Sequence, residues 1–310
     1  MIISASYRTD IPAFYGRWFL NRLAAGHARV VNPYGGPPGR VDLTRAAVDG
    51  FIFWTKNLGP FLEALEDVDA RGFPFVVQYS ATGYPRALER SVIAPEAAVE
   101  HMRLVRGRWG PRSVVWRYDP IAVTTLTPPA WHRESFARLA EALRGVTDEV
   151  VTSFMEPYRK TARNLDVAAR AASFEWRDPE AEEKRALLAE LAGIAAERGM
   201  GLTLCTQPAL EGVSGVAPAR CVDAARLSDV AGRAVNAKQK GNRPGCLCVE
   251  SRDIGAYDTC PHGCVYCYAV SSRAAARNRF QAHDPEGEFL FSPVPLTGTP
   301  SSPSRPASRG

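Results

Sequence analysis

The first 204 residues of this chain contain no cysteine, and the whole chain has only five histidines and four methionines. No stretch approaches the roughly 18 consecutive apolar residues that a membrane-spanning helix needs. The 24 prolines and 25 glycines are scattered without a period, which excludes collagen, a coiled coil and a chain disordered throughout. The first residues show no basic region followed by an apolar run, so we expect a cytoplasmic protein without a membrane partner.

Neither the acidic nor the basic residues are concentrated in one part of the chain. The 38 basic and 33 acidic side chains give a net charge of +5, spread along the chain. Nucleic-acid-binding proteins usually show a clustered basic footprint. A solvated, arginine-rich surface is the simpler interpretation, and a nucleic-acid partner is disfavoured.

Short β-branched or aromatic runs alternate with helical patterns over the first 210 residues. These runs cover residues 2–6, 28–33, 51–57, 75–82, 113–120, 149–155 and 201–207. Alternation at this spacing predicts an α/β fold with a parallel sheet, wound as a TIM-type barrel or partial barrel. We expect the barrel over 1–210, a cysteine-rich segment packed on it over 211–290, and a disordered Pro/Ser-rich tail over 291–310.

Polar residues follow several of these predicted strands. In a barrel of this type, chemistry sits at the carboxyl ends of the strands. Arginine and lysine there can bind a carboxylate or phosphate, and aspartates can hold those cations or accept ribose hydroxyls. The alternative is a set of Arg–Asp pairs that brace the barrel mouth. The candidate catalytic residues are Arg8, Asp10, Lys56, Asn57, Arg117 and Asp119, and the candidate cofactor-binding residues are Ser6, Arg8, Gln78 and Arg117.

The most specific signal is a C-x3-C-x2-C pattern formed by Cys260, Cys264 and Cys267, with Tyr266 before the last cysteine. Three thiolates at this spacing can bind three irons of a 4Fe-4S cluster and leave the fourth iron open. Zinc is the alternative, with His262 inside the loop as a further ligand.

This pattern resembles the cluster motif of radical S-adenosylmethionine (radical SAM) enzymes, which lies in a loop after a strand. The resemblance implies an open cluster that binds S-adenosylmethionine, takes an electron from a donor such as flavodoxin or ferredoxin, and acts on a small polar substrate. Residues 253–257 would form the strand before the loop. In such enzymes the motif usually follows the first barrel strand, so its late position here implies a permuted barrel, with this strand beside residues 2–6.

The other four cysteines, Cys205, Cys221, Cys246 and Cys248, form a second candidate metal site. Four thiolates suffice for a second iron–sulfur cluster or a structural zinc ion. Alternatively, Cys205 is simply a buried apolar residue.

Blocks along the chain resemble the bacterial family catalogued as domain of unknown function 1848. They are the first 19 residues, FWTKN, WRYDP and the tail RPGCLCVESRDIGAYDTCPHGCVYCYA. The resemblance implies that barrel and cysteine tail form one unit. It also supports as site positions the candidates that match its motif blocks, namely Ser6, Arg8, Asp10, Lys56, Asn57, Arg117 and Asp119. We rank a radical SAM-like enzyme first, a TIM-barrel hydrolase or isomerase with a structural zinc or cluster second, and a nucleic-acid-binding or repair protein third.

Overall fold

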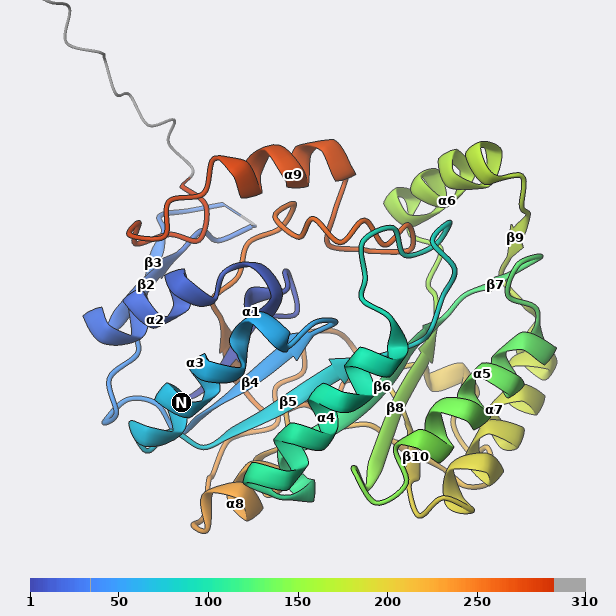
Figure 1. The fold of residues 1–310 in the computed structure, drawn as a ribbon, viewed down its shortest axis with the longest axis horizontal. Coiled ribbons are helices and arrows are strands. Elements are labelled where there is room, and N and C mark those ends of the chain that lie inside the picture. Colours follow the sequence, from blue (N-terminus) through green and yellow to red (C-terminus); the bar gives the residue numbers. More distant parts are fainter. Residues whose placement is uncertain (34, 293–310) are drawn as a thin grey trace, which may run out of the picture.

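Eight parallel strands form the central sheet in the computed structural model of the chain, which describes residues 1–33 and 35–292 (Figure 1). The strands lie in the order β12-β1-β4-β5-β6-β8-β10-β11. Their bounds are β1 Ile2–Ala5, β4 Gly50–Thr55, β5 Phe75–Ser80, β6 Val114–Ile121, β8 Glu149–Phe154, β10 Gly201–Leu204, β11 Val216–Pro218 and β12 Ser251–Asp253. The predicted α/β class with a parallel sheet is therefore confirmed.

The sheet order follows the chain order except at one edge, where the last strand lies beside the first. β12 pairs in parallel with β1, with Ile2 opposite Ser251 and Ser4 opposite Asp253. Within residues 1–33 and 35–292 the two edge strands β11 and β12 do not pair with each other, so closure into a TIM barrel is not confirmed. Both edge strands come from the cysteine-rich segment, which thus shares the sheet with the N-terminal part of the chain.

Two predicted sheet strands are wrong in detail. Residues 28–33 contribute β2 (His27–Val30), which pairs with β3 (Gly39–Asp42) in a separate antiparallel hairpin. That hairpin contacts the C-terminal region instead of the sheet, since the Arg29 N–H donates to the Glu288 carbonyl (2.9 Å). The last strand covers residues 251–253 and not 253–257, because the Asp253 carboxylate accepts the Gly255 N–H (2.9 Å) and turns the chain.

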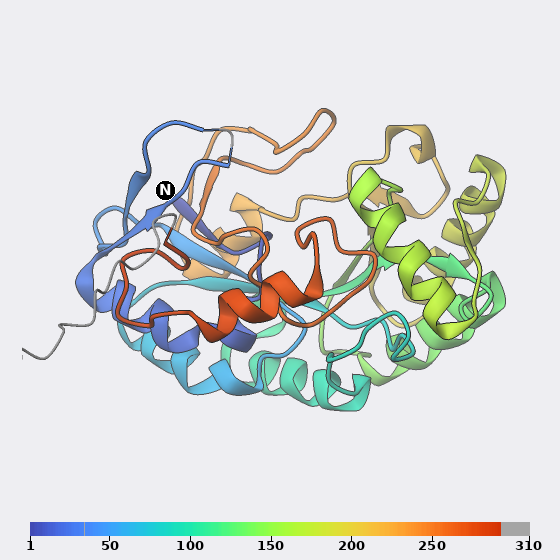
Figure 2. The same cartoon turned by 90° about the horizontal axis from the view of Figure 1, so that it is seen from above.

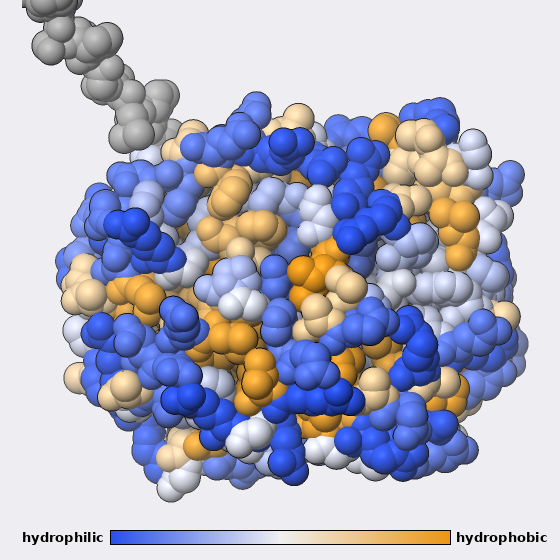
Figure 3. All heavy atoms as spheres, viewed as in Figure 1, coloured by the Kyte–Doolittle hydropathy of each residue, from blue (hydrophilic) through white to orange (hydrophobic). Residues whose placement is uncertain are grey.

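Helices flank the sheet, and most of the long ones lie on one of its faces. They are α1 Ile11–Phe14, α2 Gly16–Ala25, α3 Leu62–Ala70, α4 Pro95–Trp109, α5 Pro129–Ala142, α6 Arg159–Ala172, α7 Ala181–Ala196, α8 Ala224–Ala231 and α9 Arg273–Gln281. A minor antiparallel pair joins β7 (Val123–Thr124) and β9 (Trp176–Arg177). Seen from above, α2 to α5 line one side of the sheet and the orange-coloured residues lie on the other (Figure 2). The helical face is mostly hydrophilic outside, with apolar residues showing between polar ones (Figure 3).

The alternation of side chains along each strand divides the interior into two apolar clusters. Phe51 and Phe53 of β4 point into the larger cluster beneath the helices. Ile52 points to the opposite face, where the inner residues of five strands pack against residues 219–248, including Val222 and Leu227. The irregular segment after β11 therefore completes the core on the face that the long helices leave uncovered.

Local signals explain the limits of the longest helices. Pro95 begins α4, where its missing N–H costs no hydrogen bond, and Gly110 ends it with a φ of +88°, a conformation that favours glycine. Among the described residues, no helix combines the length and the apolar character needed to cross a bilayer. The predicted tail lies, from residue 293 onward, outside the described residues.

The buried His132 ring gives the fold a specific pH dependence. Burial lowers the pKa of His132 to about 4, and its nitrogens bond to the Tyr118 hydroxyl (3.0 Å) and the Ala122 carbonyl (3.1 Å). The unfolded ring takes up a proton near its ordinary pKa of 6.5, so stability from this group is present above that pH and is lost as the pH falls toward 4.

We expect this group to remove about 2 kcal/mol of unfolding free energy between roughly pH 7.5 and pH 5. The measurement is urea unfolding of the wild type and His132→Gln at both pH values. The variant should be less stable at the higher pH and should lose less on acidification. Equal losses in both proteins would contradict the assignment.

Candidate metal and ligand site

The three-cysteine loop begins directly after β12, at the carboxyl end of the sheet. Backbone hydrogen bonds join it to the segment after β5: the Val265 N–H donates to the Leu88 carbonyl (3.0 Å), and the Ser91 N–H donates to the His262 carbonyl (3.0 Å). The loop is closed at its base by the Asp258 N–H, which donates to the Ala269 carbonyl (2.9 Å). The sheet edge and the loop after β5 therefore both hold the cysteine loop in place.

The three thiols of this loop lie close enough together to interact electrostatically. Burial raises the pKa of Cys260, Cys264 and Cys267, and the charge of Cys267 acts on both of the others. Each is partly accessible. As positioned in residues 1–33 and 35–292, no three His, Cys, Asp or Glu side chains are close enough together to hold a single metal ion. A cubane cluster spaces its ligands more widely, because several irons and sulfides lie between them.

His262 is engaged by protein groups and not directed at the thiols. Its Nε2 lies 2.8 Å from Asp10 Oδ2, and its Nδ1 lies 3.3 Å from the Ser91 carbonyl oxygen. The side chain is buried and packs edge-on against Phe14, with ring centroids 4.6 Å apart. A zinc shell that used His262 would have to break the contact with Asp10.

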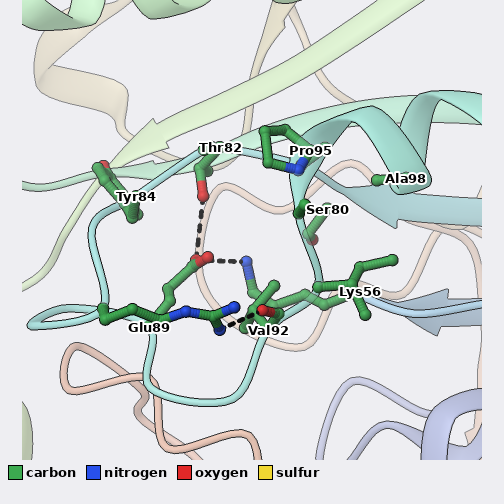
Figure 4. A pocket seen from close by; sticks show the side chains of 13 residues that line it. Lys56, Ser80, Thr82, Tyr84, Glu89, Val92, Pro95 and Ala98 are labelled. Carbon is green, nitrogen blue, oxygen red and sulfur yellow. Dashed lines mark hydrogen bonds and ion pairs between the residues drawn. The ribbon is translucent and has the colours of Figure 1, made fainter.

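A buried carboxylate, Glu89, links the loop to strand β4. Lys56 Nζ donates to Glu89 Oε1 (2.8 Å), and so does the Thr82 hydroxyl (3.0 Å) (Figure 4). The Tyr266 hydroxyl donates to the same oxygen. The aromatic residue of the cysteine motif is thus a hydrogen-bond donor to this carboxylate. Lys56 also lies close enough to Cys264 for their charges to interact.

Lys56 and Glu89 form one wall of a pocket of about 220 Å³. Ser80 at the end of β5, with Thr82 and Tyr84 after it, forms the next part of the wall, and Val92 and Pro95 close it near the start of α4 (Figure 4). The pocket combines apolar walls with a few polar groups, which is typical of small-molecule sites.

Ser6 and Arg8 converge on a residue that the sequence analysis missed, Asp253. The Asp253 carboxylate accepts hydrogen bonds from the Ser4 hydroxyl (3.0 Å), the Ser6 hydroxyl (2.7 Å) and the Tyr7 N–H (3.0 Å). Arg8 Nε lies 3.8 Å from it and has no hydrogen-bond partner of its own within the described chain. Burial raises the pKa of Asp253, although Arg8 acts in the opposite direction. Only the pairing of β12 with β1 reveals this role.

Gln78, Arg117 and Asp119 form a connected row on the inner face. Arg117 donates to Asp119 Oδ2 (2.8 Å), Gln78 Oε1 (3.2 Å) and the Cys221 sulfur (3.1 Å). Its guanidinium also lies 5.1 Å from the centre of the Trp54 ring. The geometry matches the predicted bracing of the barrel mouth by Arg–Asp pairs as well as a ligand-binding role.

Two other predicted site residues shape the backbone. Asp10 Oδ1 caps α1 by accepting the Ala13 N–H (2.9 Å), and its Oδ2 accepts the Lys56 N–H (2.7 Å). Asn57 Oδ1 accepts the Gly59 N–H (3.1 Å) in the turn after β4. Asp10 borders the site through His262, whereas the described contacts of Asn57 are those of a turn.

The second cysteine set gathers at the carboxyl end of β10. The Cys205 and Cys221 sulfurs are 3.7 Å apart, and Cys248 accepts the Val222 N–H (3.3 Å). Cys248 also contacts the thiols of Cys221 and Cys246. All four sulfurs predicted as a second site are therefore brought into one group.

The Lys56–Glu89 pair generates a test of the site's electrostatics. Glu89→Leu leaves the Lys56 charge without its partner in a largely buried position, and we expect a loss of about 3–5 kcal/mol in unfolding free energy. The double variant Lys56→Met/Glu89→Leu removes both charges and should regain most of that loss. Urea unfolding measures both.

The exposed carboxylate of Glu96, which pairs with Arg138, is the matched control. Glu96→Leu should cost less than about 1 kcal/mol. A double variant no more stable than Glu89→Leu would contradict a simple charge-pair role.

A family model described as Domain of unknown function (DUF1848) matches residues 2–269, which includes the whole sheet and the three-cysteine loop. Curated proteins of known function give no match.

Proposed function

Since the chain belongs to the family described as domain of unknown function (DUF1848), whose description assigns no activity, we propose its function from its own residues. The protein is a cytoplasmic radical SAM-like enzyme that acts on a small polar substrate at the carboxyl edge of its sheet. Its sheet is a permuted partial barrel of the TIM type. The convergence of three thiols in one loop beside β1 is the observation on which this proposal depends.

Cys260, Cys264 and Cys267 would hold three irons of a 4Fe-4S cluster, and the fourth iron would be left for the ligand. The donor set fits because it consists of three partly accessible thiols that influence one another, while the neighbouring imidazole is held by Asp10 and Ser91. When bound and reduced by a donor such as flavodoxin or ferredoxin, the cluster would supply the electron for cleaving S-adenosylmethionine.

The charges around the loop suggest how the ligand carboxylate is bound. Lys56, Arg117 and Arg8 each have a carboxylate partner, namely Glu89, Asp119 and Asp253. Lys160, in the first turn of α6, has none within the described residues. Its Nζ lies 6.0 Å from the centre of the Tyr257 ring and 3.4 Å from the Tyr268 carbonyl oxygen, and its charge reaches Cys267.

A cation without an acidic partner beside the loop is suited to bind an incoming carboxylate. We therefore assign the amino-acid carboxylate of S-adenosylmethionine to Lys160. The pocket beside Lys56 and Glu89 is the proposed place for the substrate, because it is adjacent to Cys264 and has few polar groups to satisfy.

Metal content and spectroscopy test the cluster. After anaerobic reconstitution we expect about four irons and four sulfides at this loop, and an electron paramagnetic resonance signal that changes when S-adenosylmethionine is added. Cys260→Ala/Cys264→Ala/Cys267→Ala should lose both the irons and the response, while circular dichroism reports whether it remains folded. The single variant Cys264→Ala is a second test if the triple variant does not fold. Zinc without iron, or a spectrum indifferent to S-adenosylmethionine, would refute the proposal.

Binding measurements test Lys160. Lys160→Met should weaken S-adenosylmethionine binding roughly tenfold, which corresponds to about 1.4 kcal/mol. Iron content should not change. Arg170→Met, on an exposed position of the same helix, is the control and should bind as the wild type does. Equal affinities for the Lys160 variant and the wild type would place the carboxylate elsewhere.

A further inference from the structure

We infer that Cys205, Cys221, Cys246 and Cys248 bind one zinc ion in a tetrahedral, fully ligated structural site, separate from the three-cysteine loop. The inference does not depend on the proposed function, since it uses none of the residues of the first loop. It rests on the contacts among the four sulfurs, on the three chain segments that bring them together and on the cations around them.

The Cys205–Cys221 pair has the sulfur spacing of a single ion, and the described side chains must shift to bring a third and a fourth sulfur to the same point. Four sulfurs at about 2.3 Å from a tetrahedral zinc stand about 3.8 Å from one another. The Cys205 and Cys221 sulfurs are 3.7 Å apart. Cys221 contacts Cys248, and Cys248 contacts Cys246, through their thiols. A cubane cluster would need its ligands further apart, with irons and sulfides between them.

The two ends of this chain of sulfurs meet at one hydroxyl. Thr206 Oγ1 lies 3.8 Å from the Cys205 sulfur and also contacts the Cys246 thiol. The four sulfurs therefore form an open chain of contacts, and Thr206 lies between its first and last members. Completing the shell requires the Cys246 side chain to replace the hydroxyl as the neighbour of Cys205.

Three separate parts of the chain supply the ligands. Cys205 directly follows β10, Cys221 follows β11, and Cys246 and Cys248 belong to the C-x-C turn before β12. Tight backbone packing fixes this turn, because a Cβ on Gly241 would collide with the Cβ and carbonyl of Cys246. Structural zinc sites commonly join such distant segments where little regular structure is present.

Two guanidinium groups surround the sulfurs. Arg117 donates to the Cys221 sulfur at 3.1 Å, and Arg243 Nη2 lies 3.7 Å from the Cys205 sulfur. A zinc ion with four thiolates carries a net charge of −2, which these two cations offset. The thiol protons are released to solvent when the ion binds. Arg117 therefore connects the zinc site to Asp119 and the polar row.

The site would fasten the irregular segment to the sheet. Residues 219–248 cover the inner face through Val222, Leu227 and Val235, with only the short helix α8 as regular structure. A metal crosslink between the end of β10, Cys221 and the C-x-C turn would add to the backbone hydrogen bonds of this segment, such as that from the Lys240 N–H to the Cys248 carbonyl (3.0 Å).

Metal analysis of the full chain, expressed with both zinc and iron available, tests the site. We expect about one zinc per chain, and X-ray absorption at the zinc edge should give about four sulfurs at about 2.3 Å. Cys246→Ser/Cys248→Ser should lose the zinc. The triple alanine variant of Cys260, Cys264 and Cys267 is the reciprocal control and should keep it.

The outcomes separate this inference from the proposed function. Zinc retained in the triple alanine variant, in a protein that never takes up iron, would support the zinc site and refute the cluster. Iron and sulfide remaining in that variant would overturn the zinc site in favour of a second cluster. Nitrogen or oxygen scatterers, one iron without sulfide, or substoichiometric zinc in the wild type would overturn it as well. The wild-type absorption measurement decides the matter even if the serine variant does not fold.

Discussion

The parallel pairing of β12 with β1 is the contact on which the rest of the site depends. It is three residues long and joins segments 249 residues apart, with Ser4 opposite Asp253. The Asp253 carboxylate adds hydrogen bonds from Ser6 and Tyr7 to this short ladder. Because the cysteine loop starts immediately afterwards, this single register places its thiols beside the ends of β1, β4 and β5. A shift of one residue would turn Asp253 to the opposite face.

On one face of the sheet, the same strands contribute apolar residues to the core and, further along each strand, polar residues to the candidate site. In β4, Ile52 packs against the segment 219–248, and Trp54, two residues later, donates to Ser4. In β6, Val115 lies in the same apolar cluster, and Arg117 and Asp119 follow on the same side. The packed apolar residues give the polar side chains on these strands a rigid base.

Periodicity and motif spacing predicted much of this arrangement. Six of the seven proposed strands are in the sheet, because β-branched runs between helical patterns are a local signal. The hairpin of residues 27–42 was missed because the sequence of β2 looks like that of a sheet strand. Its pairing with β3 and its contact with Glu288, neither of which the local sequence reveals, place it outside the sheet. Asp253, Glu89 and Lys160 were missed for the same reason: each acquires its role from residues far away in the chain. The contact of His262 with Asp10 could not be predicted either, because the two residues lie far apart in the chain.

The Asp119 carboxylate interacts electrostatically with residues beside both groups of cysteines. Its charge acts on Arg117 and Cys205 on one side and on Lys56 and Tyr268 on the other. A carboxylate in that position balances the cations that face each group of sulfurs. The tighter sulfurs, of which Cys205 and Cys221 are 3.7 Å apart, suit one ion that holds the fold, whereas the three-thiol loop suits a larger group with an open position. If both proposals hold, the spacing of sulfurs along a single edge of the sheet separates a structural metal from a reactive one.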